Sequence, residues 1–401
     1  MFLFKTFMKK DEMDNFAKVL VLYTGGTIGM KKKNGTYVPA PNEFGNALRN
    51  DPTLDDKEFI DAYFGDVKDQ PYCLPSHHET KKRIVYWLNE YDPLLDSSDI
   101  KLDDWIKIAK DIEKYYNDFD GFVVLHGTDT LAYTASALSF LIDNLSKPVV
   151  VSGAQIAIVE EDSDGHDNLI GALLVAGSCN VPEVTVYFDG KLLRANRCVK
   201  LDSISTGAFV SPNVDPLAVM DKVIKVNEKE EFKQPENKEL SVTDKLCENV
   251  TILYMYPFIQ TQMVETALQE PVEGVVIKSY GAGNLPSNRE DIMDAIKKAV
   301  NRGCIVVNTS QCVKGHVHTN YETGKMIHDA GVIFGADMTT ETAFVKLSYI
   351  LGRDDWDLEM KKRMMTKSLK GEVDEREEEE KENEDSAEIN EEDKMEQYKP
   401  V

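Results

Sequence analysis

The sequence predicts an α/β protein with a larger N-terminal parallel-sheet domain and a smaller C-terminal α/β domain. Short, continuous apolar runs rich in β-branched residues alternate with helix-like segments along most of the 401 residues. Such runs are typical of strands that are covered on both faces, as in a parallel sheet. A polar stretch at 226–248 separates two sets of these runs, which indicates a linker between two domains.

The N-terminal set has apolar runs at 19–23, 122–125, 148–151 and 184–188, which predict four strands. Apolar residues spaced three and four apart predict a helix over 131–145. The first three strands end at the loops TGGT, HGTD and SGAQ. Ligands in open α/β sheets bind beyond the carboxyl ends of the strands. We therefore expect these three loops to converge on one site.

The C-terminal set predicts four further strands, at 250–253, 275–277, 304–307 and 332–334. These runs place the second α/β domain at 249–370 and the first at 18–225. Residues 1–17 form an N-terminal extension, and residues 371–401 contain fifteen Asp or Glu against four Lys or Arg. A segment so acidic and so poor in large apolar residues cannot bury enough surface to fold, so we expect it to be disordered.

Composition narrows the function classes. The formal net charge of −24 opposes binding to nucleic acid or to an anionic membrane. The six cysteines are scattered and form no C-x-x-C pair, and the N-terminus lacks the apolar core of a signal peptide. No stretch approaches the roughly 20 apolar residues of a transmembrane helix. The sequence therefore predicts a soluble, cytoplasmic protein with reduced thiols.

Taken singly, each motif is ambiguous. The segment TGGTIG at 24–29 lacks the spacing of a dinucleotide or P-loop site, and is equally compatible with a tight turn. HGTDT at 126–130 brings a hydroxyl and a carboxylate to a helix start, which is equally compatible with an N-cap. For His126 we favour a packed position over catalysis, and for Cys312 a buried apolar position over a nucleophile. The histidines show no metal-ligand spacing, so no metal site is expected.

Together, these motifs resemble the L-asparaginases of the bacterial type. TGGTIG, HGTDT and Asn196-Arg197-x-x-Lys200 occur in the family's order, and the segments at 91–98, 152–155, 163–165 and 279–284 are most similar to its type I cytosolic branch. The resemblance runs from about residue 18 to 370. It implies hydrolysis of L-asparagine to L-aspartate and ammonia through an acyl-enzyme, with no cofactor.

The resemblance also implies roles for individual residues. Thr27 corresponds to the primary nucleophile, and Tyr37 to the tyrosine of a mobile lid that closes beside it. Thr128, Asp129 and Lys200 correspond to a second catalytic triad. The substrate-binding residues that the family pattern implies are Asp96, Ser97 and Ser98, together with Thr128 and Asp129.

Further implications concern assembly and regulation. The family forms homodimers and homotetramers, as dimers of dimers, in which Asn284 and, more loosely, Tyr321 would reach a neighbouring subunit's site. Regulated type I enzymes bind asparagine at an allosteric site whose arginine, cysteine and threonine correspond here to Lys278, Cys312 and Val199. Lysine lacks the bidentate fork of arginine and valine cannot hydrogen-bond, so we expect weak or altered allostery.

The chemistry of these residues suits amide hydrolysis. That reaction needs a nucleophile, a base and stabilisation of an oxyanion. A threonine hydroxyl is a weak nucleophile, and Lys200 with Asp129 and Thr128, or Tyr37, would activate it. Two alternatives stay open: a related amidohydrolase or lysophospholipase-type activity on the same fold, and a non-catalytic binding protein.

Overall fold

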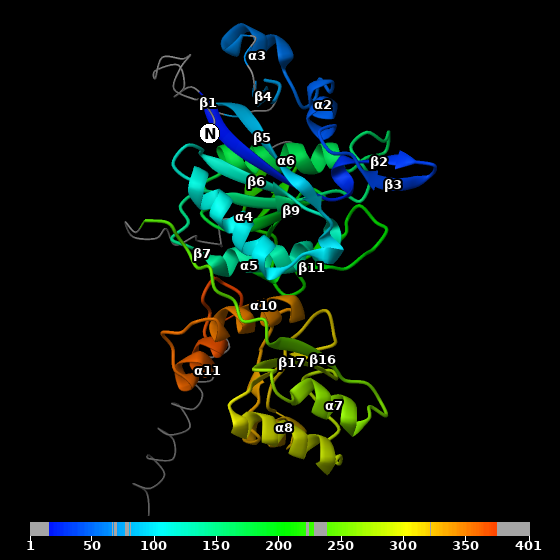
Figure 1. The fold of residues 1–401 in the computed structure, drawn as a ribbon, viewed down its shortest axis with the longest axis vertical. Helices are drawn as coiled ribbons and strands as arrows, with labels where there is room; N and C mark the ends of the chain where they lie inside the picture. Colours follow the sequence, from blue (N-terminus) through cyan, green and yellow to red (C-terminus); the bar gives the residue numbers. More distant parts are fainter. Residues whose placement is uncertain are drawn as a thin grey trace, which may run out of the picture. The chain divides into compact units, whose positions relative to one another are not determined.

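A computed structural model describes residues 16–65, 67, 70–76, 80, 82–221, 224–227, 239–320 and 322–374 (Figure 1). The chain divides into two compact units. Unit 1 comprises Met1–Asn249 and Glu341–Arg353, and unit 2 comprises Val250–Thr340 and Asp354–Val401. The segment 341–353, which the sequence places in the C-terminal domain, therefore packs with unit 1. There the Thr342 hydroxyl donates to the Asn196 carbonyl at 2.8 Å.

Unit 1 is built on a nine-stranded sheet in the order β14-β13-β10-β9-β8-β6-β1-β5-β4. Its five inner strands, from β9 to β5, are mutually parallel, and the predicted strands 19–23, 122–125, 148–151 and 184–188 all lie in it. The strands are β1 (Phe16–Gly25), β4 (Tyr72–Cys73), β5 (Arg83–Leu95), β6 (Gly121–Leu125), β8 (Val149–Ser152), β9 (Val184–Phe188), β10 (Lys191–Arg194), β13 (Ala218–Met220) and β14 (Ile224–Val226).

The edges of this sheet are antiparallel, which the sequence does not predict. Strand β10 follows β9 after only Asp189 and Gly190, whose φ values of 50° and 70° suit a tight hairpin turn. A two-residue connection can join only antiparallel neighbours. Strands β13 and β14 extend the same meander, and β4 pairs antiparallel with β5 at the other edge.

Helices cover both faces of the sheet: Figure 1 shows α6 on one side and α4 and α5 on the other. The helices of unit 1 are α2 (Phe44–Arg49), α3 (Lys57–Phe64), α4 (Leu102–Tyr115), α5 (Leu131–Leu141), α6 (Gly165–Ser178) and α10 (Thr340–Leu351), the last beginning one residue before the unit. Helix α5 is wrongly predicted at its end. Ile142 is already extended and, in β7 (Ile142–Asp143), pairs with Val242 of β15 (Ser241–Val242).

The three predicted loops lie together at the carboxyl ends of β1, β6 and β8. A Cβ added to Gly26 would lie 2.6 Å from the Cα of Gly127, and one added to Gly153 would lie 2.3 Å from the His126 carbonyl oxygen. The Gly127 backbone in turn lies against Ser97, which follows β5. Because β5 and β6 flank β1 on opposite sides, this is the switch point at which ligands bind in such sheets.

Below these loops, His126 is fully buried in a hydrogen-bond chain. Its Nδ1 lies 2.7 Å from the Gly127 carbonyl, which can only accept, so Nδ1 carries the proton. The Thr134 hydroxyl, 3.0 Å from Nε2, then donates to the ring and accepts from Trp105 Nε1 at 2.9 Å. Burial lowers the pKa of His126 to about 4. The expected packed position of His126 is confirmed.

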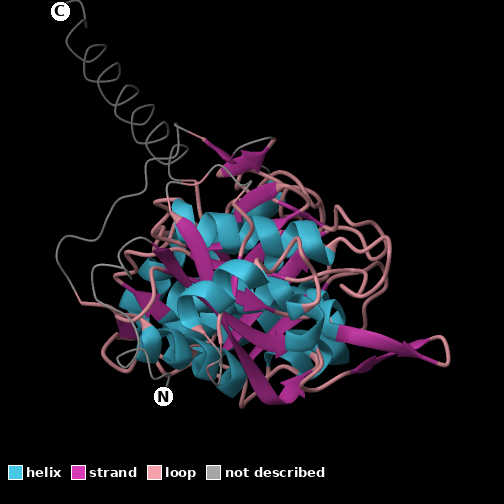
Figure 2. Ribbon diagram, turned by 90° about the horizontal axis from the view of Figure 1, so that it is seen from above, coloured by secondary structure: helices cyan, strands magenta, loops and turns pink. Residues whose placement is uncertain are grey.

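A two-stranded hairpin projects from unit 1 in both Figure 1 and Figure 2. It consists of β2 (Met30–Lys33) and β3 (Thr36–Pro39), joined by Asn34 and Gly35 with φ values of 53° and 81°. Its strand β3 contacts the short helix η1 (Thr27–Gly29). The remaining strand pair of unit 1 is β11 (Val199–Lys200) with β12 (Phe209–Val210).

Unit 2 contains a four-stranded parallel sheet that matches the four predicted strands. Its strands are β16 (Val250–Tyr254), β17 (Gly274–Ser279), β18 (Ile305–Ser310) and β19 (Ile333–Phe334), in that order. Its helices are α7 (Thr261–Leu268), α8 (Glu290–Arg302), α9 (Glu322–Asp329) and α11 (Leu358–Thr366). Helix α8 buries Ile292, Ile296 and Ala299 at helical spacing and ends at Gly303, whose φ of 103° suits a helix C-terminus.

The expected disordered tail is ordered at its start. Glu372 is fully buried and accepts hydrogen bonds from the backbone of Leu369 and Lys370, while the Asp374 backbone donates to Asp337. These bonds offset the ordering entropy of 371–374. The rest of the acidic segment, 375–401, and the extension 1–15 lie outside the described residues. No helix in the described part of the chain is long and apolar enough to cross a membrane.

Protonation of His126 should destabilise unit 1. In the unfolded chain His126 binds a proton below its ordinary pKa of 6.5, whereas in the fold it does so only near 4. Stability is therefore lost as pH falls from about 6.5 to about 4, by about 3 kcal/mol in all. Urea unfolding at pH 7 and pH 4.5 measures this loss. A His126→Gln variant should lack this part of the pH dependence, and equal dependence in both proteins would contradict the assignment.

The contact between Gly26 and Gly127 should tolerate no side chain. Gly26→Ala places a Cβ 2.6 Å from backbone atoms at a φ of 96°, so we expect it to lower the free energy of unfolding by at least about 3 kcal/mol. Gly35→Ala is the control, since its φ is 81° but nothing lies within 4 Å of its added Cβ. It should cost only about 1 kcal/mol. Similar losses of stability in the two variants would show that the positive φ, and not the close contact with Gly127, causes the destabilisation.

Candidate functional site

Thr27 begins the turn that follows β1. Gly25 and Gly26, with φ values of 139° and 96°, let the chain leave the strand and approach the backbone of Gly127, and Gly29 then closes the turn by donating to the Gly26 carbonyl at 3.3 Å. Thr27 is half-buried, and its hydroxyl has no hydrogen-bond partner within the described part of the chain. The Thr27 side chain is therefore partly accessible and lies in a hydrogen-bonded turn.

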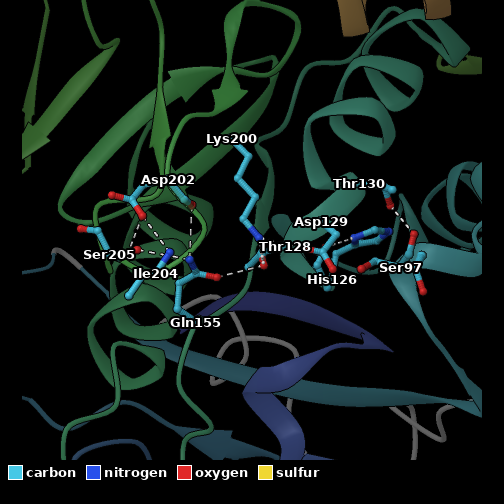
Figure 3. A network of polar contacts seen from close by, with 12 residues as sticks. Ser97, His126, Thr128, Asp129, Thr130, Gln155, Lys200, Asp202, Ile204 and Ser205 are labelled. Atoms are coloured by element: carbon cyan, nitrogen blue, oxygen red, sulfur yellow. Dashed lines mark hydrogen bonds and ion pairs between the residues drawn. The ribbon is translucent and has the colours of Figure 1, made fainter.

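Thr128, Asp129 and Lys200 form one hydrogen-bonded group, which Figure 3 shows from close by. The Lys200 ammonium donates to Thr128 Oγ1 at 2.8 Å and to Asp129 Oδ1 at 2.7 Å. The Lys200 side chain is 18% exposed, whereas that of Asp129 is 69% exposed. The structure thus brings together the three residues of the expected second triad, across 71 residues of sequence.

Gln155 completes this group, although the sequence pointed only to its motif. Its Oε1 accepts the Thr128 hydroxyl at 3.1 Å, and its Nε2 donates to the carbonyls of Ser205, at 3.2 Å, and Asp202, at 3.5 Å (Figure 3). The Thr128 oxygen can then accept from Lys200 while its hydrogen points to Gln155. The signal available in the sequence was the position of Gln155 in a loop directly after a strand.

The loop after β5 carries Asp96, Ser97 and Ser98. Asp96 Oδ1 accepts from the Ser98 backbone at 2.9 Å and from its hydroxyl at 2.8 Å, and these bonds lower the pKa of Asp96. Asp96 therefore keeps its charge. The carbonyl of the buried Ser97 accepts the Thr130 hydroxyl at 2.6 Å, which fixes this loop beside the triad. An ionised carboxylate such as that of Asp96 can pair with an ammonium group.

Tyr37 lies on the projecting hairpin, directly opposite Lys32 in the β2–β3 register. The Lys32 ammonium is 5.0 Å from the centre of the Tyr37 ring, and 3.0 Å from Glu160 Oε2. Glu160 belongs to the loop that also contains Gln155. The hairpin and the triad are therefore linked through one loop.

The remaining predicted residues belong to unit 2. Asn284 Oδ1 accepts the Thr323 hydroxyl at 2.6 Å, and the backbone of Asn284 bridges to that of Tyr280. The Lys278 carbonyl accepts from the Gln311 amide at 2.9 Å. Cys312 is exposed, so the expectation that it is buried is wrong: its residue lies in the loop after β18 rather than in the core. Tyr321 lies outside the described residues.

Among the described residues, no group of three or more His, Cys, Asp or Glu side chains could hold a metal ion. The side chains in contact with Thr128 are instead the carboxamide of Gln155 and the ammonium of Lys200, which also bonds the Asp129 carboxylate. Such a set can bind a zwitterion, move a proton and attack a carbonyl group.

Comparison with known proteins agrees with the family that the sequence motifs resemble. The family model "Asparaginase, N-terminal" matches residues 18–232, and "Glutaminase/Asparaginase C-terminal domain" matches 249–365. The chain is 54% identical over 357 residues to an L-asparaginase of Dirofilaria immitis, covering 89% of this chain and 60% of that protein. It is 40% identical over 356 residues to the 60 kDa lysophospholipase of Homo sapiens, covering 89% and 61%.

Both of these relatives are thus longer proteins, of which the chain spans about three fifths. The structure of L-asparaginase I from Vibrio cholerae is matched over nearly its whole length, with a TM-score of 0.76, 37% identity, and coverage of 89% of this chain and 99% of that one. Because the two family models together match most of its residues, the chain belongs to the asparaginase family.

Proposed function

We propose that this protein is an L-asparaginase that hydrolyses L-asparagine to L-aspartate and ammonia with Thr27 as its nucleophile. The observation that carries the proposal is the contact of Lys200 with both Thr128 and Asp129, at 2.8 and 2.7 Å, beside the backbone contact that holds the Thr27 turn. The relatives named L-asparaginase support the choice of substrate.

The proposed reaction proceeds through an acyl-enzyme. Thr27 Oγ1 attacks the side-chain amide carbon, and backbone N–H groups of the glycine-containing loops stabilise the oxyanion. The amide nitrogen takes a proton as the C–N bond breaks and leaves as ammonia, and water then hydrolyses the ester to release L-aspartate. Tyr37 assists removal of the Thr27 proton, and Lys200 with Thr128 and Asp129 moves protons at the second threonine.

Asp96 and Asp129 are the proposed partners of the substrate's ammonium group, and Ser97 and Ser98 position its carboxylate. Asp96 supports this role because the Ser98 bonds keep it ionised while its second oxygen stays available. Burying a free amino acid needs both of its charges paired. No step in this scheme uses a metal or an organic cofactor.

Assembly and regulation remain proposals of the same kind. We propose a homodimer or a dimer-of-dimers tetramer in which Asn284 and Tyr321 serve a neighbouring subunit's site. The substitution of lysine and valine at Lys278 and Val199 supports weak allostery, with Cys312 the one retained member of that set. The net charge of −24 makes nucleic acids and anionic membranes poor partners.

The second candidate function is hydrolysis of lysophospholipids. It is favoured by the 40% identity to the human 60 kDa lysophospholipase. The acidic chain and a site lined by charged and hydroxyl groups fit a small zwitterion better than an acyl chain, because a long apolar ligand needs an apolar pocket.

Steady-state assays with L-asparagine, L-glutamine and a lysophospholipid distinguish these functions. We expect the highest kcat/KM for L-asparagine, a lower value for L-glutamine and no turnover of the lipid, with a hyperbolic rise in rate. Thr27→Ala should lower the rate of ammonia release at least about 1000-fold without changing Tm. Turnover of the lipid alone would favour the second function, and an active Thr27→Ala would exclude this nucleophile.

We expect Lys200 to contribute to catalysis through its hydrogen bonds to Thr128 and Asp129, and not through its charge alone. Lys200→Met removes the donor to Thr128 and Asp129, so we expect kcat to fall at least about 100-fold with a smaller change in KM. Lys191→Met is the control, because the Lys191 ammonium also faces a carboxylate, that of Asp189 at 3.4 Å, but at an exposed surface. Equal effects of the two variants on kcat would contradict a proton-transfer role for Lys200.

A further inference from the structure

The hairpin that carries Tyr37 is bound to the rest of unit 1 by two ion pairs, that of Lys31 with Glu43 and that of Lys32 with Glu160. It spans only residues 30–39, and all the side chains from Lys31 to Thr36 are exposed. A two-stranded hairpin is at best marginally stable in water without further contacts. The position of the Tyr37 hydroxyl therefore depends on whichever side chains bind the hairpin to the body of the unit.

Lys32 makes such a contact on the face of the hairpin that presents Tyr37. In an antiparallel pair, directly opposite residues share one face, and Lys32 is directly opposite Tyr37. The Lys32 ammonium bonds Glu160 Oε2 at 3.0 Å and lies 5.0 Å from the centre of the Tyr37 ring. The hydrogen bond to Glu160 raises the pKa of Lys32, so the ammonium is retained.

Glu160 belongs to a loop that is firmly bound to the site. The Ile158 backbone donates to the carbonyl of Ile28, in the Thr27 turn, at 2.9 Å, and the Glu160 backbone donates to Ala157 at 2.9 Å. Earlier in the loop, the Gln155 and Ile156 backbones donate to the Asp164 carboxylate, and Gln155 accepts the Thr128 hydroxyl. A charge on this loop has a fixed position relative to both threonines.

We propose that the ion pair between Lys32 and Glu160 is a latch that holds the hairpin so that Tyr37 faces Thr27. The two residues are positioning residues: neither contacts the substrate, and both act through Tyr37. This inference rests on the proposed function only for its effect on catalysis, since the position of the hairpin is a property of the fold.

The ion pair that forms the latch contributes only a small free energy. The side chains of Lys32 and Glu160 are 45% and 30% exposed, and such pairs are partly screened by salt. Two like charges at these two positions would repel each other. Reversing the charge of Lys32 or of Glu160 alone therefore replaces the attraction by a repulsion, and reversing both charges restores the attraction. A closed hairpin stabilised to this extent can still open to admit substrate and release product.

The test uses Lys32→Glu, Glu160→Lys and the double reversal in the full chain. Each single variant should lower kcat/KM for L-asparagine about three- to tenfold, and the double variant should recover most of the loss. Lys33→Glu is the matched control, because Lys33 has the same charge on the opposite face of the hairpin and forms no ion pair with any described residue. It should remain near wild type, and Tm should be similar in all four variants.

Hydrogen exchange of residues 30–39, measured by mass spectrometry, gives a readout that does not need activity. Exchange should be faster in both single variants and return toward wild type in the double variant. Absence of this pattern overturns the latch, as does a double variant no better than its parents. Failure of the proposed function is distinguishable: wild type would then not hydrolyse L-asparagine, or Thr27→Ala would stay active, whatever the exchange of the hairpin.

Discussion

The backbone contact between Gly26 and Gly127 is the constraint on which the candidate site depends. The two glycines follow adjacent parallel strands, β1 and β6, and their main chains are closer than any side chain would permit. This contact brings the Thr27 turn beside Thr128, and the packing of Gly127 on Ser97 adds the loop that carries Asp96. The site is therefore set by the register of the sheet, and side chains only complete it.

The polar groups around this contact form two sets of hydrogen bonds, one at His126 and one at Thr128. His126 is neutral and fully buried, and its ring connects the Gly127 carbonyl to Thr134 and Trp105, so it supports the loop without titrating near neutrality. Above it, Lys200 and Gln155 direct the hydroxyl of Thr128. Hydrogen bonds of this kind fix the geometry of the loops because several of them act on the same groups.

Much of the fold could be predicted because its strands are continuous apolar runs. The sequence predicts too long a helix α5, because Ile142 and Leu145 continue the helical spacing. In the fold, Ile142 pairs with Val242, a hundred residues away, and this pairing ends the helix. The motifs of the site were found through their order in the chain. Gln155 was not singled out, because its partners lie 27 to 50 residues away and become neighbours only in the fold.

The two threonines differ in their surroundings, since Thr128 is buried and Thr27 is only half-buried. Thr128 is held by Lys200 and Gln155 through partly buried hydrogen bonds, whereas the Thr27 turn is contacted by strand β3 of an exposed hairpin. Apolar anchoring would hold that hairpin shut, because burying several side chains is worth several kcal/mol. An exposed ion pair is worth only about 0.2–1 kcal/mol, so the latch that we propose would align Tyr37 and still allow the hairpin to open.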